Sequence, residues 1–545
     1  MITSRTRIAA LLVALCSSLP VAAADKVVSA PAGVVQGEAV GALHVFKGIP
    51  YALAPTGTRR WKPPLDVPKW KGTRDATKFG PACIQPKSRS DSIYLLDLPA
   101  MSEDCLSLNI WAPASARKAP VLVWIHGGSL TIGAGSEPVY EGTKLAGHGI
   151  VVVSVNYRMG VLGYLAHPAL SAESRRNISG NYGLLDQIAS LRWVKQNIAA
   201  FGGDPSNVTI AGESAGALSV MYLMAAPEAR GLFAKAITQS AYMISTPQLR
   251  DTAFGDVAAE ALGVWVAGKV GAGDLAGLRS MDAAALTNAA AAAGYIPFGT
   301  IDGRVLPRQL VDAFDRGEQA KVPILAGFNS GEIRSLRVLA PPVPADAATY
   351  EKQIRDRYGD LADAFLRQYP STDLAESVLA TTRDALYGWT ATRLVQRQTS
   401  AGKPSFLYFF DHGYPAADSQ GLHAFHASEI PYVFGTASKT TSRWPAIPST
   451  PAEAALSDAM TSYWASFARD GVPSASGQPA WQPYGTEQAY MAFESGPQPR
   501  THLLPGMYEL NEQVVCRRRA KGGIPWNWNV GLASPALPAG TTQCR

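Results

Sequence analysis

The pentad Gly212-Glu213-Ser214-Ala215-Gly216 constrains the fold of this chain more than any other segment. It has the form Gly-x-Ser-x-Gly, in which a serine stands on a sharp turn from a strand into a helix with its hydroxyl exposed above the sheet. The glycines suit such a turn because side chains there would collide with neighbouring backbone. Glycine and serine are common residues, so the pentad alone is also compatible with an ordinary turn.

The residues on either side of the pentad support the strand-turn-helix interpretation. Residues 208–211 form a short apolar, partly β-branched run that predicts a buried strand. Residues 215–225 contain no proline and have spaced apolar positions, which predicts a helix. Ser214 is therefore expected at the carboxyl end of a strand.

Other apolar runs along the chain alternate with helical patterns. Continuous β-branched runs separated by helices are typical of a parallel sheet covered on both faces. The sequence predicts an α/β fold with a large, mostly parallel central sheet, helices on both faces, and a functional site beyond the carboxyl ends of the strands. Strands are predicted at 121–125, 150–155, 208–211, 322–326 and 406–410, and an amphipathic helix at 184–199.

The composition is that of a globular protein, since 47% of the 545 residues are hydrophobic and 17% are charged. No linker or charge block divides the chain, so we expect a single domain over residues 25–545. Helical insertions are expected around 245–320, where alanine is frequent, and we interpret them as a cap beside the site. The alternative is that these helices only fill space.

The first 24 residues are predicted to be a signal peptide, which implies a secreted or periplasmic protein. Arg5 and Arg7 precede the apolar run 8–15, and the small residues 22–24 offer a cleavage site before Asp25. The apolar run is too short to span a bilayer, and no later stretch predicts a membrane span.

The formal net charge of +6 is small for so large a surface. We therefore expect neither nucleic acid nor an anionic membrane as a partner. The one basic run, Arg517-Arg518-Arg519, is interpreted as a solvated surface segment. The sequence assigns no oligomeric state.

Four cysteines remain after cleavage, and an even number in an exported chain indicates disulfides. Three pairings are possible, and proximity favours Cys83 with Cys105 and Cys516 with Cys544. Neither pair has the close spacing of a zinc site and no histidine lies nearby, so no metal is expected.

A serine nucleophile needs a base, and histidine suits because its pKa lies near the working pH. In folds with this pentad the order along the chain is serine, acid, histidine. Among the histidines after Ser214, His426 stands in a loop after the predicted strand 406–410. Order and placement favour it only slightly over His423.

The acid must then lie between Ser214 and the histidine. Glu332 follows the predicted strand 322–326 through a glycine-bearing loop, which would bring a carboxylate to the edge of the sheet. Asp302 is the alternative, but its Ile-Asp-Gly setting is typical of a turn aspartate.

Backbone N–H groups are needed to stabilise the oxyanion of an acyl-transfer intermediate. The segment His126-Gly127-Gly128-Ser129 follows the predicted strand 121–125, where such a loop is expected. Ala215, the residue after the serine, would supply a further donor.

Together these segments resemble the type-B carboxylesterase and cholinesterase-like family of α/β-hydrolases, from about Val35 to about Phe493. The segments similar to its serine signature are 180–187, 197–198, 201–205 and 212–216, and those similar to its other motifs are Glu103-Asp104-Cys105-Leu106 with Asn109, Asn156-Tyr157-Arg158 and Gln239-Ser240. The resemblance implies an α/β-hydrolase fold and hydrolysis of a small-molecule ester without a cofactor.

The resemblance also implies a role for each candidate. Ser214 matches the nucleophile. Glu332 matches the acid in a Gly-x-Asn-x-x-Glu segment, which decides against Asp302, and His426 matches the base in a His-x-x-Glu-Ile-Pro-Tyr segment, which decides against His423. The implied oxyanion donors are Gly128, Ser129 and Ala215, and the implied family disulfide is Cys83–Cys105.

The chain departs from the family pattern at three places. Ser129 replaces the usual third glycine, so a side chain enters the site. Tyr94 is the only aromatic residue between Cys83 and Cys105, where cholinesterases hold choline on a tryptophan, so choline esters are not expected substrates. The Cys516–Cys544 tail has no counterpart in the pattern.

The expected function is that of an exported serine carboxylesterase. A non-catalytic adhesion or binding protein is the alternative, but such family members typically lack the nucleophile. A lipase, a feruloyl or tannin esterase, and a detoxifying esterase for bulky polyesters would share the fold and triad, because substrate choice depends on the surrounding loops.

Overall fold

The structure, a computed structural model, describes residues 25–87, 91–95, 98, 100–526, 530–541 and 544. The predicted signal peptide, residues 1–24, lies outside the described residues. In the described ranges, no helix has the length and apolar character needed to cross a membrane.

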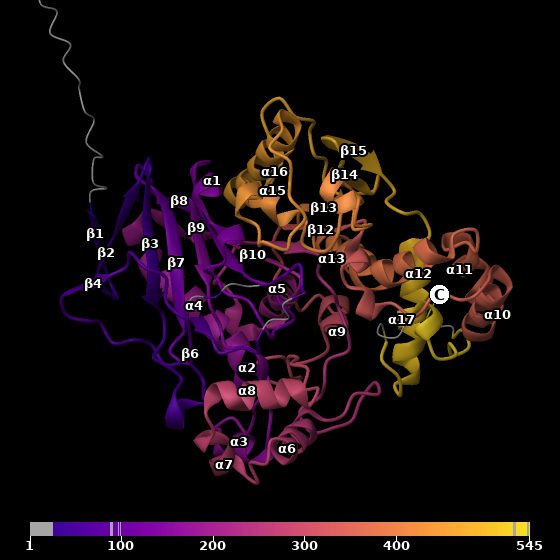
Figure 1. Ribbon diagram of the computed structural model, residues 1–545, viewed down its shortest axis with the longest axis horizontal. Helices are drawn as coiled ribbons and strands as arrows, with labels where there is room; N and C mark the ends of the chain where they lie inside the picture. The colour runs from indigo at the N-terminus through magenta and orange to yellow at the C-terminus, as the bar shows by residue number, and fades with distance from the viewer. Residues whose placement is uncertain are drawn as a thin grey trace, which may run out of the picture.

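One large sheet organises the described chain, and its central strands are parallel, as the sequence predicts (Figure 1). The strands in the middle of the sheet pair in parallel with their neighbours. Antiparallel pairs form its two edges. The order is β1 (Asp25–Ala30), β2 (Gly33–Val40), β3 (Leu43–Pro50), β7 (Ser107–Pro113), β9 (Val151–Val155), β8 (Ala119–Ile125), β10 (Gly203–Glu213), β11 (Lys235–Gln239), β12 (Ile324–Asn329), β13 (Ser405–Phe410), β14 (Ala489–Phe493) and β15 (Pro497–Thr501), with β4 (Thr73–Asp75) beside β2.

Helices cover both faces of this sheet because successive side chains of a strand point to opposite faces. In β8, Val121 and Val123 join the apolar cluster on one face, and Leu122 and Trp124 join the cluster on the other. Figure 1 shows the two sets of helices on opposite sides of the strands. The first set includes α4 (Tyr182–Asn197), α5 (Ala215–Ala225) and α13 (Trp389–Ser400), and the second includes α1 (Thr143–Ala146), α15 (Ile430–Phe434) and α16 (Pro451–Asp470).

The predicted elements around the pentad are present with small differences in length. Helix α5 has the predicted bounds, and α4 begins and ends two residues earlier than predicted. Strand β10 begins five residues earlier, at Gly203, which pairs with Ala119 before the register shifts. The residues between Gly203 and Val208 are polar or proline, so no apolar pattern could have revealed this extension.

The segment 245–320 contains α6 (Ala259–Lys269), α7 (Leu275–Ser280), α8 (Ala283–Ala292) and α9 (Leu310–Asp315). The first three pack in a separate apolar cluster with α2 (Gly160–Tyr164) and α3 (Pro168–Glu173). Its members include Val161, Leu278 and Leu286. That these helices act as a cap on the site stays a prediction.

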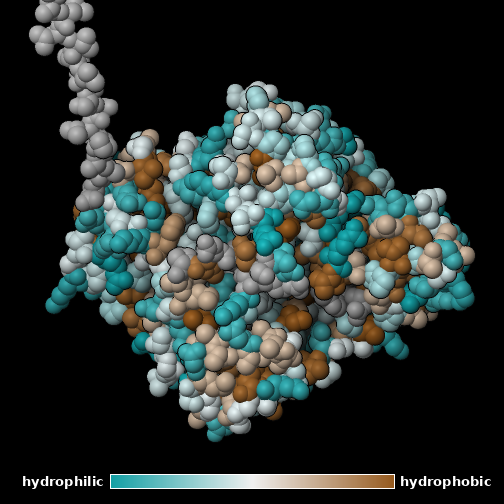
Figure 2. Space-filling model, in the orientation of Figure 1, coloured by the Kyte–Doolittle hydropathy of each residue, from teal (hydrophilic) through white to brown (hydrophobic). Residues whose placement is uncertain are grey.

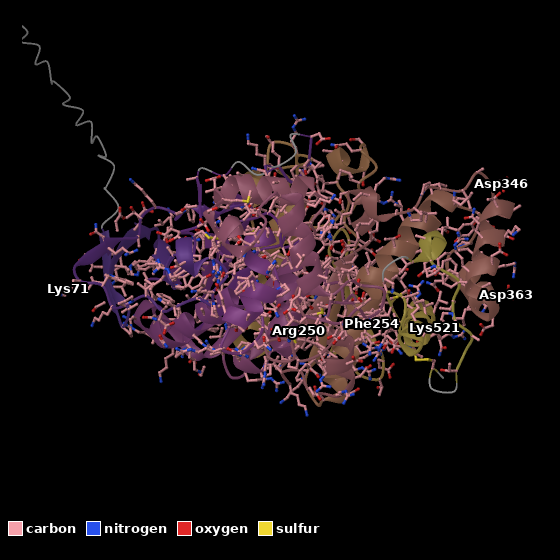
Figure 3. The ribbon with its side chains drawn as sticks, turned by 90° about the horizontal axis from the view of Figure 1, so that it is seen from below. Lys71, Arg250, Phe254, Asp346, Asp363 and Lys521 are labelled. Carbon is pink, nitrogen blue, oxygen red and sulfur yellow. A yellow bond between two sulfur atoms is a disulfide. The ribbon has the colours of Figure 1, made fainter. Side chains whose placement is uncertain are left out.

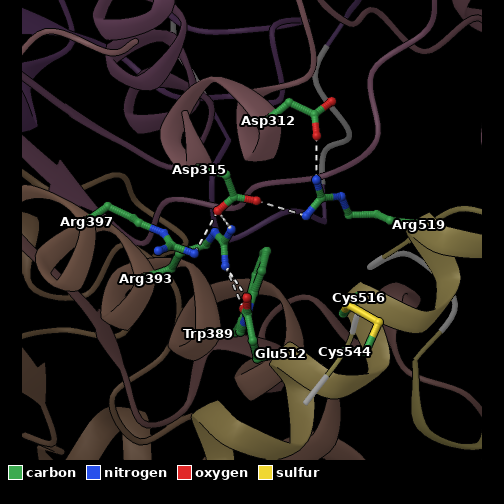
Figure 4. A network of polar contacts seen from close by, with 9 residues as sticks. All are labelled: Asp312, Asp315, Trp389, Arg393, Arg397, Glu512, Cys516, Arg519 and Cys544. Carbon is green, nitrogen blue, oxygen red and sulfur yellow. Dashed lines mark hydrogen bonds and ion pairs between the residues drawn. A yellow bond between two sulfur atoms is a disulfide. The ribbon is translucent and has the colours of Figure 1, made fainter. Parts of the chain in front are cut away.

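Both predicted disulfides are present, Cys83–Cys105 and Cys516–Cys544. The second joins α17 (Met507–Lys521) to the end of the chain (Figure 4). It thereby closes the C-terminal tail, which lies beyond the motifs that resemble a known family.

Helix α17 is also held by a group of ion pairs centred on Asp315 of α9 (Figure 4). Asp315 pairs with Arg393 and Arg397 of α13 and with Arg519 of α17. The buried Arg393 also pairs with Glu512 at 2.6 Å. Three helices distant in sequence are therefore joined by one carboxylate.

The interpretation of Arg517-Arg518-Arg519 as a solvated segment is wrong. The Arg517 side chain is 6% exposed and pairs with Asp360 at 2.7 Å, and Arg518 is fully buried. Arg519 pairs with Asp315. Successive residues of a helix point about 100° apart, so a helix with packed neighbours buries part of any such run.

The molecule is elongated, with Lys71 near one end and Asp346 and Asp363 at the other (Figure 3). The second end is built by α10 (Ala347–Tyr358), α11 (Ala362–Gln368) and α12 (Leu374–Arg383). On the face drawn in Figure 2, hydrophilic and hydrophobic side chains are interspersed rather than gathered in one band.

Candidate active site

Ser214 stands between β10 and α5, at the carboxyl end of a strand in the middle of the sheet. Its φ of 55° is unusual for a residue other than glycine, as expected for a strained turn that exposes a hydroxyl. Its N–H donates to the carbonyl of Gln239, at the end of the neighbouring β11, at 2.9 Å. The serine is 8% exposed.

The glycines around Ser214 allow backbone to approach backbone. A Cβ on Gly216 would overlap the carbonyl oxygen of Ile125, the last residue of β8. A Cβ on Gly127 would lie 2.9 Å from the carbonyl oxygen of Glu213 and 3.2 Å from Cβ of Ser214. The turn after β8 and the serine turn therefore touch directly.

Glu332 begins the short 3-10 helix η5 (Glu332–Arg334), just after β12, and is fully buried. One carboxylate oxygen accepts the N–H of Asn329 at 2.8 Å, and the other is hydrogen-bonded to Nδ1 of His426. The loop carrying His426 is tied to the same turn, because Asn329 Nδ2 donates to the carbonyl of Phe425 at 2.9 Å. The predicted acid and base thus meet.

His426 lies between α14 (Pro415–Asp418) and α15, is 5% exposed, and has the ring of Tyr387 5.3 Å from its own. Its Nε2 lies 3.1 Å from Oε1 of Glu213. In the described part of the chain, no hydrogen bond joins His426 to the Ser214 hydroxyl. The structure therefore places His426 beside the pentad, with Nε2 next to Glu213, the residue before the serine.

Carboxylates surround this imidazole on two sides. Burial lowers the pKa of His426, but Glu213 and Glu332 outweigh it and raise that pKa to about 9. Burial raises the pKa of Glu213 well above its ordinary value. A third buried acid, Glu429, accepts hydrogen bonds from Gln239 Nε2 at 2.9 Å and from Asn329, and its pKa is raised mainly by burial.

The predicted oxyanion loop has an irregular backbone. Gly128 and Ser129 have φ values of 97° and 56°. The carbonyl of Gly128 accepts the N–H groups of Thr131 and Ile132 at 2.9 and 3.0 Å, and a Cβ on Gly128 would overlap the carbonyl oxygen of Ile132. Ala215 is the first residue of α5, where an N–H has no partner within the helix.

The rival candidates lie in other settings. His423 bridges Asp418 at 2.8 Å and Asp411 at 3.1 Å. Asp302 accepts the side-chain amide of Asn181 at 2.9 Å and the N–H groups of the three residues that follow Gly303. Both arrangements are those of structural polar contacts rather than of a group facing Ser214.

Three residues near the imidazole were not assigned a role from the sequence. Glu213 is part of the pentad, and Glu429 stands three residues after His426 in the same motif. Tyr387 belongs to none of the motifs and lies in a π-helical turn, Asp384–Gly388. Within the described ranges, no three His, Cys, Asp or Glu side chains are grouped so that they could hold a metal ion.

Known proteins share both the sequence and the architecture. The sequence model of the Carboxylesterase family matches residues 24–510. A fumonisin B1 esterase of Sphingopyxis macrogoltabida is 37% identical over 85% of each chain, and a para-nitrobenzyl esterase of Bacillus subtilis is 36% identical over 82% of this chain and 91% of the relative. A solved carboxylesterase of Geobacillus stearothermophilus has a TM-score of 0.76 at 36% identity, covering 89% of this chain and 99% of that one. This chain therefore belongs to the carboxylesterase family, and it is an ester hydrolase with the α/β-hydrolase fold.

Proposed function

We propose that this protein is an exported serine carboxylesterase that uses Ser214, His426 and Glu332 as its catalytic triad. One observation carries the proposal: the buried Glu332 is hydrogen-bonded to Nδ1 of His426 at the same edge of the sheet that carries Ser214. A carboxylate on Nδ1 leaves Nε2 as the atom that exchanges a proton with a nucleophile.

The reaction proceeds in two displacements. His426 Nε2 takes the proton of Ser214 as its oxygen attacks the ester carbonyl, and Glu332 stabilises the imidazolium. Collapse of the tetrahedral intermediate breaks the ester bond, and His426 returns the proton to the leaving alcohol. Water, deprotonated by His426, then releases the acid and restores the serine hydroxyl.

The negative oxygen of each intermediate is bound by the N–H groups of Gly128, Ser129 and Ala215. The close contact of the loop after β8 with the serine turn supports this assignment, as does the place of Ala215 at the N-terminus of α5, where the helix dipole favours negative charge. The Ser129 side chain narrows the space that an acyl group would enter.

Export is supported by the predicted signal peptide and by the two disulfides. Mass spectrometry of the protein recovered from the periplasm or medium of an expressing bacterium tests this. A mature chain that retains residues 1–24 would contradict cleavage.

Hydrolysis of p-nitrophenyl butyrate by the purified mature protein tests the triad. Ser214→Ala and His426→Ala should lower kcat by about 10⁵-fold or more. Ser462→Ala is the control and should keep its activity, because the Ser462 hydroxyl donates to the carbonyl of Asp458 within its own helix, α16. A Ser214→Ala variant that remains fully active would overturn the assignment.

Substrate class is tested with a series of p-nitrophenyl esters of increasing chain length. A preference for long chains with interfacial activation identifies a lipase, and a preference for short chains identifies a carboxylesterase of small esters. The names of the two bacterial relatives add fumonisin B1 and p-nitrobenzyl esters to the series. Their turnover would favour a detoxifying esterase.

A further inference from the structure

The hydroxyl of Tyr94 contacts the segments that carry two members of the proposed triad. It donates to the main-chain carbonyl of His426 at 2.7 Å and lies 2.8 Å from Oγ of Ser335. Ser335 directly follows η5, whose first residue is Glu332. Since the single phenolic proton is used on His426, Ser335 donates the second hydrogen bond.

Tyr94 belongs to neither of those segments. It lies in the stretch closed by the Cys83–Cys105 disulfide. Its ring packs edge-on against Trp444, with centroids 6.0 Å apart, and Trp444 in turn packs on Phe425, the residue before His426. The tyrosine is therefore held by packing at its ring and by hydrogen bonds at its tip.

The peptide group after His426 needs such support. Ala427 has a φ of 69°, which is unfavourable for a residue with a Cβ. A hydrogen bond to the carbonyl of His426 fixes the orientation of the peptide that precedes this strained residue. Burial raises the pKa of Tyr94 well above its ordinary value, so the phenol remains a donor throughout the neutral range.

We propose that Tyr94 is a positioning residue, which holds the backbone of His426 so that the imidazole keeps its hydrogen bond to Glu332 while Nε2 exchanges a proton. The inference rests on the proposed triad. A small rotation at this peptide would move Nε2 by a comparable amount, and proton transfer is sensitive to such a displacement.

The test compares Tyr94→Phe with Tyr414→Phe. Tyr414 lies in the same small apolar cluster, but its hydroxyl donates to the carbonyl of Pro445 at 3.0 Å. Removal of the Tyr94 hydroxyl should lower kcat for p-nitrophenyl butyrate about five- to tenfold, the effect of one lost hydrogen bond, with KM unchanged. Tyr414→Phe should leave kcat unchanged.

The pH profile supplies a readout that a purely structural role would not move. The charged groups facing the imidazole are Glu213, Glu332 and the nearby Glu429. In Tyr94→Phe a weaker contact with Glu332 would lower the pKa of His426, so the acid limb of kcat/KM should move to lower pH. An unchanged limb together with an unchanged kcat overturns the proposal, as does an equal loss of kcat in Tyr414→Phe.

Two further measurements keep the outcome decisive. If Tyr94→Phe does not fold, Ser335→Ala replaces it and should lower kcat about twofold, with the same shift of the acid limb of kcat/KM. No change in either quantity overturns the proposal.

Labelling of Ser214 by a fluorophosphonate is measured in parallel. An unlabelled wild type refutes the triad itself, whereas a labelled wild type with an unaffected Tyr94→Phe refutes only the role of Tyr94.

Discussion

Oε1 of Glu213 lies 3.1 Å from Nε2 of His426, on the edge of the imidazole that faces away from Glu332. The residue next to the proposed nucleophile thus touches the atom expected to receive the proton. Two carboxylates on opposite edges of one ring both favour its charged form.

Glu213→Gln should move the acid limb of the kcat/KM profile to lower pH, by about one unit. Glu213 helps to raise the pKa of His426 to about 9, and only the neutral imidazole acts as a base, so loss of this carboxylate makes the base available at lower pH. The measurement is kcat/KM from pH 5 to 10. Glu173→Gln, in an exposed pair with Arg279, is the control. A limb that stays in place would show that Glu213 does not influence the titration.

Gly128→Ala should lower kcat about 100-fold or more, because the added Cβ would overlap the carbonyl oxygen of Ile132 and displace a proposed oxyanion donor. Ser129→Gly should keep kcat within about threefold, since glycine accepts the φ of 56° and retains the N–H. Kinetics with p-nitrophenyl butyrate compare the two variants. Equal activity of Gly128→Ala and wild type would remove this loop from the mechanism.

His423→Gln should destabilise the protein at pH 6 but not at pH 9. Hydrogen bonds to Asp411 and Asp418 raise the pKa of His423, so its stabilising effect is present below the ordinary value of about 6.5 and is lost as pH rises through the raised pKa. Because the side chain is 40% exposed, the decrease in Tm at pH 6 should be small, about 1 °C. The exposed His502→Gln serves as control. An equal decrease at both pH values would exclude a charge effect.

Asp315→Asn should lower the free energy of unfolding by about 3 kcal/mol, because the fully buried Arg393 loses one of its two carboxylate partners. Asp356→Asn breaks an exposed pair with Lys352 and should cost no more than about 0.5 kcal/mol. Chemical denaturation of both variants gives the comparison. Similar values for the two would show that the group around Asp315 does not hold α17 in place.

Local patterns were sufficient for much of the fold. The bounds of α5 and the position of β9 followed from apolar spacing and β-branched runs, which are short-range properties. The early start of β10 did not, because Gly203 extends the strand only through its parallel partner Ala119. Likewise, the burial of Arg518 depends on the partners of α17 rather than on the basic run itself.

By itself, the sequence determined the α/β architecture, through apolar runs that depend only on neighbouring residues. Proximity along the chain favoured the two disulfides, and the resemblance of short motifs to a known family selected Ser214, Glu332 and His426 as candidates. Only the tertiary structure decided which groups meet: Glu332 on Nδ1 of His426, Glu213 facing Nε2, and Tyr94 on the main chain of the same histidine. These residues are separated by up to 332 positions along the chain. Local sequence patterns cannot predict such contacts, because the contacts form only when separate loops pack at one edge of the sheet.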